Sequence, residues 1–144
     1  MTVAAILKHK GHDVAAVRPT DTVAQTVALL SSKRYGAVLV RDAAGQVLGI
    51  VSERDIMHAL ARHGAATLGM TAGQLMTRQL TTASPATTVI EAMTLMTAGR
   101  FRHLPVLDQG RLVGIISIGD VVKSRIEQQE HEVDSLKAYV SGAA

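Results

Sequence analysis

The sequence contains one internal repeat. More than any other feature, this repeat limits the folds that the chain can adopt. Residues 17–57 and 83–122 align with an offset of 66 as far as Asp42 and Asp108, and with an offset of 65 after one deleted loop residue. A period near 66 with only two copies is too long for a solenoid, in which units of about 20–45 residues are stacked. The sequence therefore predicts a duplicated α/β unit with a pseudo-two-fold relation between its copies.

Each copy predicts the same order of elements. After Pro19 and Pro85, apolar side chains recur every three to four residues, which predicts a helix. The N-cap chemistry for these helices comes from Asp21 and Thr22 in the first copy and from Thr87 and Thr88 in the second. Two apolar strands follow, at 37–40 and 47–51 in the first copy and at 104–107 and 112–116 in the second. A further helix begins at Ser52 or Ser117, and Ile56, Ala59 and Leu60 are predicted on its inner face in the first copy.

The predicted fold class is therefore α/β, in the wider sense α+β, with a duplicated β-α-β-β-α repeat and a C-terminal helix. Residues 47–51 are apolar throughout, so we expect that strand to be covered on both faces. Residues 62–74 are rich in Gly, Ala and Thr and are interpreted as the linker between the repeats. The predicted domains are residues 1–72 for repeat 1, 73–126 for repeat 2 and 127–144 for a helical tail.

The tail from Val121 to Val140 has the pattern of one long helix. Its seam positions are spaced by 4, 3, 4, 3 and 4 residues, as in a coiled coil, and are Val122, Ile126, Gln129, Val133, Leu136 and Val140. Two interpretations stay open: the helix lies on its own domain, or it packs across a homodimer. The seam extends beyond the second repeat and needs a partner, so we favour the homodimer.

Composition excludes several classes of function. The chain has 144 residues, no Cys, and only three aromatic residues, so it offers no thiolate metal site, Cys nucleophile or base-stacking platform. The net charge is +3 with the basic residues scattered, which makes nucleic acid an improbable partner. No apolar stretch predicts a membrane span, and residues 1–10 lack a signal-peptide pattern, so we expect a cytoplasmic protein. No nucleophile–base or acid–base pair is recognisable, and the six His form no metal motif; we therefore expect no enzymatic activity, no metal and no catalytic cofactor.

The most informative local motif is Ser-x-x-Asp, which occurs at both strand-to-helix junctions as Ser52 to Asp55 and Ser117 to Asp120. One interpretation is a capping box, in which Ser and the acid three residues later satisfy the first N–H groups of the helix. The other is a ligand site, because a helix N-terminus favours a phosphate and a carboxylate can accept hydrogen bonds from two ribose hydroxyls. Asp is shorter than the usual Glu, so we expect it to reach its own N-cap less easily.

A second cue is the cationic run Arg100-Phe101-Arg102-His103 before the strand at 104–107. These side chains could face a phosphate or could simply complement a helix C-terminus. The first copy has Tyr35-Gly36-Ala37 at the matching positions, so the two sites should differ.

The run Arg-Phe-Arg-His-Leu-Pro-Val-x-Asp, followed by Gly-x-x-x-Gly-Ile-Ile-Ser-x-x-Asp, resembles a CBS domain, and its two copies resemble a CBS pair, or Bateman module. The resemblance covers about residues 6 to 124. It is strongest to small stand-alone bacterial CBS-pair proteins that are assigned to signal transduction. It implies two clefts that bind adenosyl ligands such as AMP, ATP, ADP, NAD or S-adenosylmethionine, and modules that pair into a flat dimer.

The resemblance also implies which residues bind the ligand. In the family the Asp of one repeat holds the ribose, while the lead-in and first strand of the other repeat enclose the adenine. By position, one cleft would use Ser52, Arg54, Asp55, Leu80, Phe101, Arg102 and His103. The other would use Val14, Ala15, Tyr35, Gly36, Ala37, Ser117 and Asp120. Gly119 offers no side chain to a phosphate, so the first cleft is the better candidate for a phosphorylated ligand.

The sequence thus predicts a regulatory adenine-nucleotide sensor that binds AMP, NAD or ATP, with AMP favoured, and signals through a conformational change or a dimer arrangement. It names no effector protein. The alternative is a ligand-free dimerisation or protein-interaction module, in which the two Ser-x-x-Asp elements are only helix caps.

Overall fold

The computed structural model describes residues 1–142, and the chain forms two compact units. Residues 13–80 make up one, which we call the repeat-1 unit. Residues 1–12 and the chain from Thr81 onward make up the other, the repeat-2 unit. The first twelve residues therefore fold with the second repeat and not with the first.

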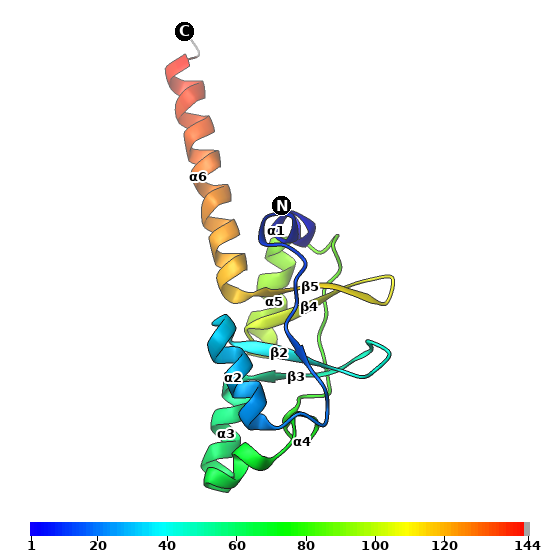
Figure 1. Cartoon of the computed structure of the whole chain (residues 1–144). Coiled ribbons are helices and arrows are strands. Elements are labelled where there is room, and N and C mark those ends of the chain that lie inside the picture. Colours follow the sequence, from blue (N-terminus) through cyan, green and yellow to red (C-terminus); the bar gives the residue numbers. More distant parts are fainter. Residues whose placement is uncertain (143–144) are drawn as a thin grey trace. The chain divides into compact units, whose positions relative to one another are not determined.

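The repeat-1 unit contains a three-stranded sheet in the order β1-β2-β3 (Figure 1). β1 (Ala16–Val17) runs parallel to β2 (Ala37–Arg41), which runs antiparallel to β3 (Val47–Ser52). The remaining elements are α2 (Val23–Lys33), α3 (Glu53–His63), the 3-10 helix η1 (Gly64–Gly69) and α4 (Ala72–Leu75). Its aliphatic core consists of Val17, Val23, Leu30, Val38, Val40, Val51, Ile56 and Ala72.

The repeat-2 unit has the same plan. β4 (His103–Asp108) pairs antiparallel with β5 (Arg111–Ser117), after α5 (Val89–Gly99) and before α6 (Ile118–Gly142). A parallel bridge joins Ala83 to Val106 where, 66 residues earlier, β1 pairs Val17 with Val40. The core includes Val3, Ile6, Leu7, Val89, Ala92, Met96, Leu104, Val106, Ile116 and Val121. The predicted fold class, a duplicated β-α-β-β-α repeat with a C-terminal helix, is confirmed.

Each unit is completed by the segment that precedes the other repeat. In the repeat-1 unit, Thr71 bridges to Thr22 at the start of α4; in the repeat-2 unit, Thr2 bridges to Thr88 at the start of α1 (Val3–Lys10). The backbone hydrogen bonds match as well, because Ala72 N–H donates to Asp21 at 2.8 Å and Val3 N–H donates to Thr87 at 2.8 Å. Residues 1–7 and 70–76, which read MTVAAIL and MTAGQLM, are thus a third repeated segment with an offset of 69.

Local signals in the sequence account for the helix ends. Thr22 and Thr88 are the N-caps of α2 and α5, and each forms a full capping box with the residue three positions later. Both helices end on an arginine in the left-handed conformation, Arg34 and Arg100, each with φ 56°. This conformation stops the helix and turns the chain into the next strand.

Residues 62–74, interpreted as the linker between the repeats, are ordered: α3, η1 and α4 occupy most of them, and the buried Thr67 hydroxyl donates to the Ala59 carbonyl at 3.0 Å. Two other expectations about the repeat-1 unit were wrong or only partly met. Leu60 is 41% exposed and so does not belong to the inner face of α3. In β3 only Gly49 and Val51 are buried, because the other face of the strand is covered only in part.

α6 begins at the second junction and includes the whole predicted tail helix. Val121 and Ser124 are buried against the repeat-2 unit, but from Ile126 on the apolar seam side chains are at least half exposed. Within the described residues, no helix is both long and apolar enough to span a membrane.

Candidate functional site: two capped strand-to-helix junctions

The two Ser-x-x-Asp elements lie at equivalent places, where β3 passes into α3 and where β5 passes into α6. At the first junction Ser52 N–H donates to Asp55 Oδ2 at 2.8 Å, and Asp55 N–H donates to Ser52 Oγ at 3.3 Å. At the second, Ser117 N–H donates to Asp120 Oδ2 at 2.8 Å, and Asp120 N–H donates to Ser117 Oγ at 3.2 Å. We expected Asp to reach its own N-cap less easily than Glu, yet both carboxylates accept the serine N–H at 2.8 Å.

The start of each helix is also anchored to the residue just before the first strand of its hairpin. Glu53 N–H donates to the Gly36 carbonyl at 3.0 Å, and Ile118 N–H donates to the Arg102 carbonyl at 2.8 Å. Together with the serine cap, this bond uses the N–H groups of the first and third residues of each helix. A phosphate at either junction would therefore find fewer backbone donors than a bare helix N-terminus provides.

The structure places the predicted ligand residues in two separate sets. The repeat-1 unit contains Ser52, Arg54, Asp55, Leu80, Val14, Ala15, Tyr35, Gly36 and Ala37. The repeat-2 unit contains Phe101, Arg102, His103, Ser117 and Asp120. Within the units, Ala37 pairs with Ser52 and His103 pairs with Ser117. The strand-entry residues of each repeat thus adjoin the Ser-x-x-Asp junction of the same repeat, and their predicted combination across repeats stays a prediction.

Sequence reasoning missed two residues that contact the junction carboxylates. Thr77, which follows α4, pairs with β3: its N–H donates to the Ile50 carbonyl at 2.8 Å, and its hydroxyl donates to Asp55 Oδ1 at 3.4 Å. In the repeat-2 unit the ammonium of Lys10, at the end of α1, donates to the Ile115 carbonyl at 2.9 Å and to Asp120 Oδ2 at 2.6 Å. The match between residues 1–7 and 70–76 is the sequence signal that would have drawn attention to both segments.

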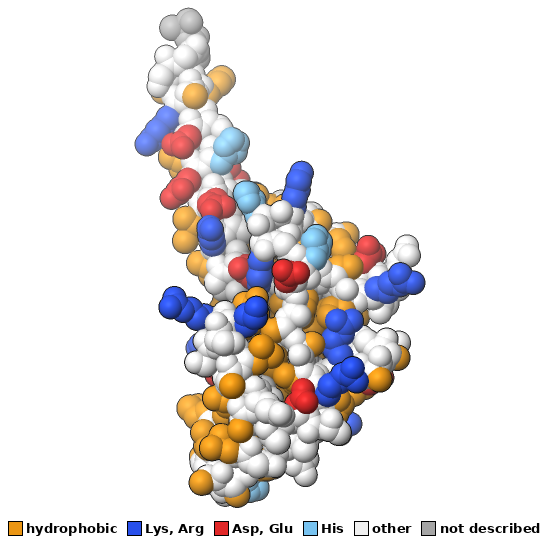
Figure 2. Space-filling model, in the orientation of Figure 1, with side chains coloured by type: hydrophobic (Ala, Val, Ile, Leu, Met, Phe, Trp, Pro, Cys, Tyr) orange, Lys and Arg blue, Asp and Glu red, His pale blue; other side chains and the backbone are white. Residues whose placement is uncertain are grey.

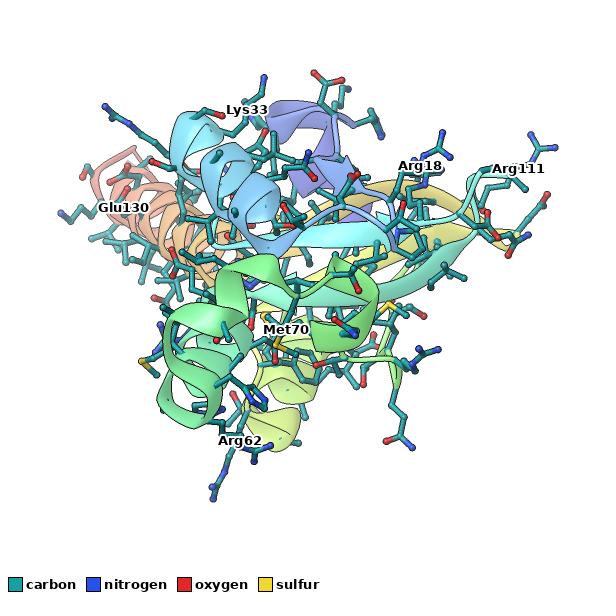
Figure 3. All side chains as sticks on the ribbon, turned by 60° about the horizontal axis from the view of Figure 1, so that its bottom comes forward. Arg18, Lys33, Arg62, Met70, Arg111 and Glu130 are labelled. Atoms are coloured by element: carbon teal, nitrogen blue, oxygen red, sulfur yellow. The ribbon has the colours of Figure 1, made fainter. Side chains whose placement is uncertain are left out.

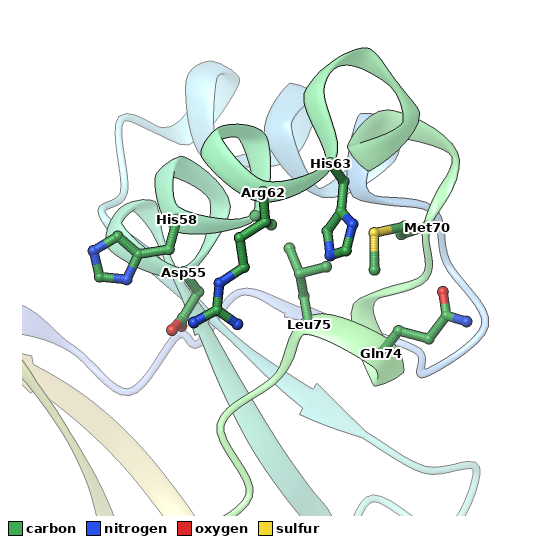
Figure 4. A pocket seen from close by; sticks show the side chains of 8 residues that line it. Asp55, His58, Arg62, His63, Met70, Gln74 and Leu75 are labelled. Atoms are coloured by element: carbon green, nitrogen blue, oxygen red, sulfur yellow. The ribbon is translucent and has the colours of Figure 1, made fainter.

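The two carboxylates consequently differ in their electrostatic surroundings. Burial would raise the pKa of the Asp120 carboxyl, but a hydrogen bond from Lys10, the Ser117 N–H, the charge of Lys10 and the Ser117 side chain together lower it below the usual value. Asp55 has the hydroxyl of Thr77 in place of an ammonium group. The second junction is therefore an ion pair. At the first, Ser52 and Thr77 donate hydrogen bonds to Asp55, and the Arg62 guanidinium lines the cleft that Asp55 also lines (Figure 4).

A cleft of about 250 Å³ borders the first junction within the repeat-1 unit. It is lined from α3, α4 and the segment before α4 by Asp55, His58, Ala59, Arg62, His63, Met70, Gln74 and Leu75 (Figure 4). Figure 3 labels Arg62 and Met70 in the wider setting of this unit. Small-molecule sites usually occupy roughly 300–1,000 Å³, so the cleft matches part of a nucleotide and not the whole of one. Among the described residues, no three His, Asp or Glu side chains are grouped as a metal site would require.

Comparison with known proteins gives consistent matches over most of the chain. The family model described as "CBS domain" matches residues 4–62 and 72–127. The CBS domain-containing protein CBSX3, mitochondrial, of Arabidopsis thaliana is 34% identical over 98% of this chain and 72% of its own. The crystal structure of the CBS-domain containing protein ATU1752 from Agrobacterium tumefaciens is 45% identical with a TM-score of 0.85, covering 86% of this chain and 92% of that one. The crystal structure of CBSX2 in complex with AMP is 29% identical with a TM-score of 0.68, covering 81% and 90% of the two chains.

Proposed function

The chain belongs to the CBS-domain family as a CBS pair with a C-terminal helix, and on that premise we propose that it is a regulatory protein that binds an adenine nucleotide. AMP is the favoured ligand, followed by NAD and ATP. The observation that carries the proposal is the pair of junctions in which Asp55 and Asp120 are held in a fixed orientation by their own serine caps. A similar chain has been crystallised with AMP, which supports an adenosyl ligand.

The proposed contacts are those that the family pattern assigns. Asp55 or Asp120 accepts hydrogen bonds from the ribose hydroxyls, and Ser52 or Ser117 fixes the carboxylate. Leu80, Phe101, Arg102, His103 and Arg54 are the proposed remaining contacts of one nucleotide, and Val14, Ala15, Tyr35, Gly36 and Ala37 those of the other. The adenine contact is then mainly aliphatic and backbone, with Tyr35 or Phe101 as the single ring available to each site.

Binding would regulate by differential affinity. A ligand shifts a conformational equilibrium only by the ratio of its affinities for the two states. We propose that the nucleotide favours one arrangement of the protein and that an effector protein recognises it. This role needs no catalytic group. The predicted cytoplasmic location stays a prediction.

Isothermal titration of the protein with AMP, NAD and ATP tests the proposal. Asp55→Ala and Asp120→Ala are the informative variants, and a fluorescence thermal shift with each nucleotide provides a second readout. Loss of nucleotide binding in at least one variant is expected. Absence of heat and of a thermal shift with every nucleotide at millimolar concentration would refute the proposal.

The ligand-free interaction module is the second candidate, and the complete capping boxes at both junctions favour it. In that case the Asp→Ala variants lose about 0.5–2 kcal/mol of stability, as N-cap deletions do, with no nucleotide response to lose. The same titrations therefore separate the two candidates.

We also propose that two copies of the chain associate as a homodimer. The support is the exposed apolar face of α6, which includes Leu136 at 64% exposure and Val133 at 50%. Light scattering after gel filtration should give twice the chain mass, and Leu136→Glu should lower it. A monomeric mass for the unchanged protein at micromolar concentration would contradict the proposal.

A further inference from the structure

At the two junctions different groups contact equivalent acceptor residues. Thr77 contacts Asp55 at Oδ1, whereas Lys10 contacts Asp120 at Oδ2, the oxygen that also accepts the serine N–H. In the repeat-1 unit, Thr77 supplies a backbone N–H to Ile50 and a hydroxyl to Asp55. In the repeat-2 unit, Lys10 supplies its ammonium to the equivalent Ile115 and Asp120, each 65 residues later. One flexible side chain thus takes over the contacts of a backbone segment and adds a positive charge next to the carboxylate.

This difference affects any ligand that must bind the carboxylate. A ribose diol offers neutral donors, so at Asp55 it competes with a hydroxyl 3.4 Å away. At Asp120 it competes with an ammonium at 2.6 Å, in an ion pair whose side chains are only 32% and 25% exposed. Charge-assisted hydrogen bonds are roughly twice as strong as neutral ones, so the second carboxylate is much harder to recruit.

We infer that Lys10 is an internal occupant of the Asp120 junction and limits the chain to one nucleotide, bound through Asp55. The inference rests on the proposed function and deepens it. The lowered pKa of Asp120 agrees with a carboxylate whose charge is already compensated.

Titration of AMP into Lys10→Met tests this directly, because methionine keeps an unbranched apolar stem and removes the charge. The unchanged protein should bind about one AMP per chain, and Lys10→Met about two. The exposed Lys8, on the same helix, gives the matched control, and Lys8→Met should keep one. Asp55→Ala should abolish AMP binding to the unchanged protein.

Two AMP per chain in the unchanged protein would overturn this inference and leave the proposed function standing. Loss of binding in Lys10→Met would also overturn it, by making Lys10 a ligand contact. If neither the unchanged protein nor Lys10→Met binds any nucleotide, the proposed function fails and the inference fails with it.

A second inference stands on α6 alone. Its seam residues fall at the two core positions of a heptad. β-Branched residues occupy one position throughout, as parallel two-stranded coiled coils prefer, and the other position holds one Val, one Gln and one Leu. The first set is Ile126, Val133 and Val140, and the second is Val122, Gln129 and Leu136. Among these, Ile126 is 50% exposed and Val140 is 73% exposed. Figure 2 shows hydrophobic side chains along one edge of this helix with charged side chains beside them.

The charges that flank the seam distinguish the two orientations of a helix pair. In a parallel, in-register pair, Arg125 faces Glu130 of the second copy, and Glu132 faces Lys137 of the second copy. In the antiparallel pairing that aligns the seam, Glu130 faces Glu130 and Glu132 faces Glu132, so like charges meet. The labelled Glu130 in Figure 3 lies on this part of α6.

We propose that a second copy of this chain covers the α6 seam as a parallel, in-register coiled coil. The chain has no Cys, so single-Cys variants report the orientation without interference. Leu136→Cys should form a disulfide-linked dimer under mild oxidation, because residue 136 then faces its own copy. His131→Cys, on the opposite helix face, is the control and should not.

A mixture of the Ile126→Cys and Leu136→Cys variants detects an antiparallel helix pair, the arrangement that would contradict the proposal. In an antiparallel pair these two positions meet, whereas in a parallel pair they are about 15 Å apart along the helix axis. A cross-linked mixed dimer without Leu136→Cys homodimers would overturn the proposal, as would a monomer at high micromolar concentration. Glu132→Lys should raise the dimer dissociation constant by roughly tenfold, and adding Lys137→Glu should restore it.

Discussion

Substitutions at two buried glycines test how firmly residues 1–7 and 70–77 pack against strands β5 and β3. A Cβ on Gly49 would lie 2.7 Å from the Thr77 carbonyl oxygen and 2.8 Å from the Met76 sulfur. A Cβ on the equivalent Gly114 would lie 2.6 Å from the Leu7 Cδ2 atom. Neither glycine is among those with positive φ, so alanine meets a steric obstacle and no backbone strain.

The obstacle at Gly49 is backbone, and this sets the magnitude. Relief requires the 70–77 segment to move away, which breaks the two hydrogen bonds between Ile50 and Thr77 at 2.8 and 3.1 Å. Overpacking costs about 1–3 kcal/mol and each lost hydrogen bond about 1 kcal/mol. At Gly114 the flexible end of Leu7 can rotate, so only the overpacking cost remains. We expect Gly49→Ala to lose about 3 kcal/mol and Gly114→Ala about 1 kcal/mol, after the small gain that alanine brings through the unfolded state.

Urea unfolding followed by far-ultraviolet circular dichroism measures both values. Gly69→Ala is the control, because a Cβ there would meet nothing within 4 Å, and it should change stability by less than about 1 kcal/mol. A Gly49→Ala loss equal to or smaller than that of Gly114→Ala would refute the reasoning, because it would mean that the 70–77 segment moves freely.

Four further substitutions test the helix caps, the Lys10–Asp120 ion pair and a left-handed arginine. Thr22→Ala and Thr88→Ala each remove a capping box and should cost about 1 kcal/mol in thermal or urea unfolding; no loss in either would show that the box adds no stability. The pKa of Asp120 is lowered in the folded state, so its stabilising effect is present above the unfolded value and is lost as the pH falls below 3.8 through the folded value. Urea midpoints across that range should therefore fall less steeply for Lys10→Met than for the unchanged protein, and equal slopes would contradict the ion pair. Arg34→Gly removes the strain of an arginine in the left-handed conformation, so it should raise the melting temperature and add up to about 1 kcal/mol of stability. A lower melting temperature would contradict this expectation.

Local patterns were enough to predict most of the elements, because each is set by residues that are neighbours in sequence. The periodicity after Pro19 and Pro85 and the threonine caps located α2 and α5, and the apolar runs located the strands within one or two residues. The helical structure within residues 62–74 was not predicted, for a related reason. A segment rich in Gly, Ala and Thr lacks strong propensity, and Thr67 and Ala72 are ordered by packing against the rest of the repeat-1 unit.

The candidate site divides in the same way. The sequence by itself determined the duplication, the fold class and the two Ser-x-x-Asp junctions, since these depend on residue identity and short spacing. Only the tertiary structure showed that residues 1–12 fold with the second repeat, which places Lys10 next to Asp120 across 110 positions of sequence. No periodicity encodes such a contact, because it arises from the packing of α1 against β5 and α6. The sequence thus predicted two equivalent Ser-x-x-Asp junctions with different flanking residues, and the long-range fold made one of them an ion pair.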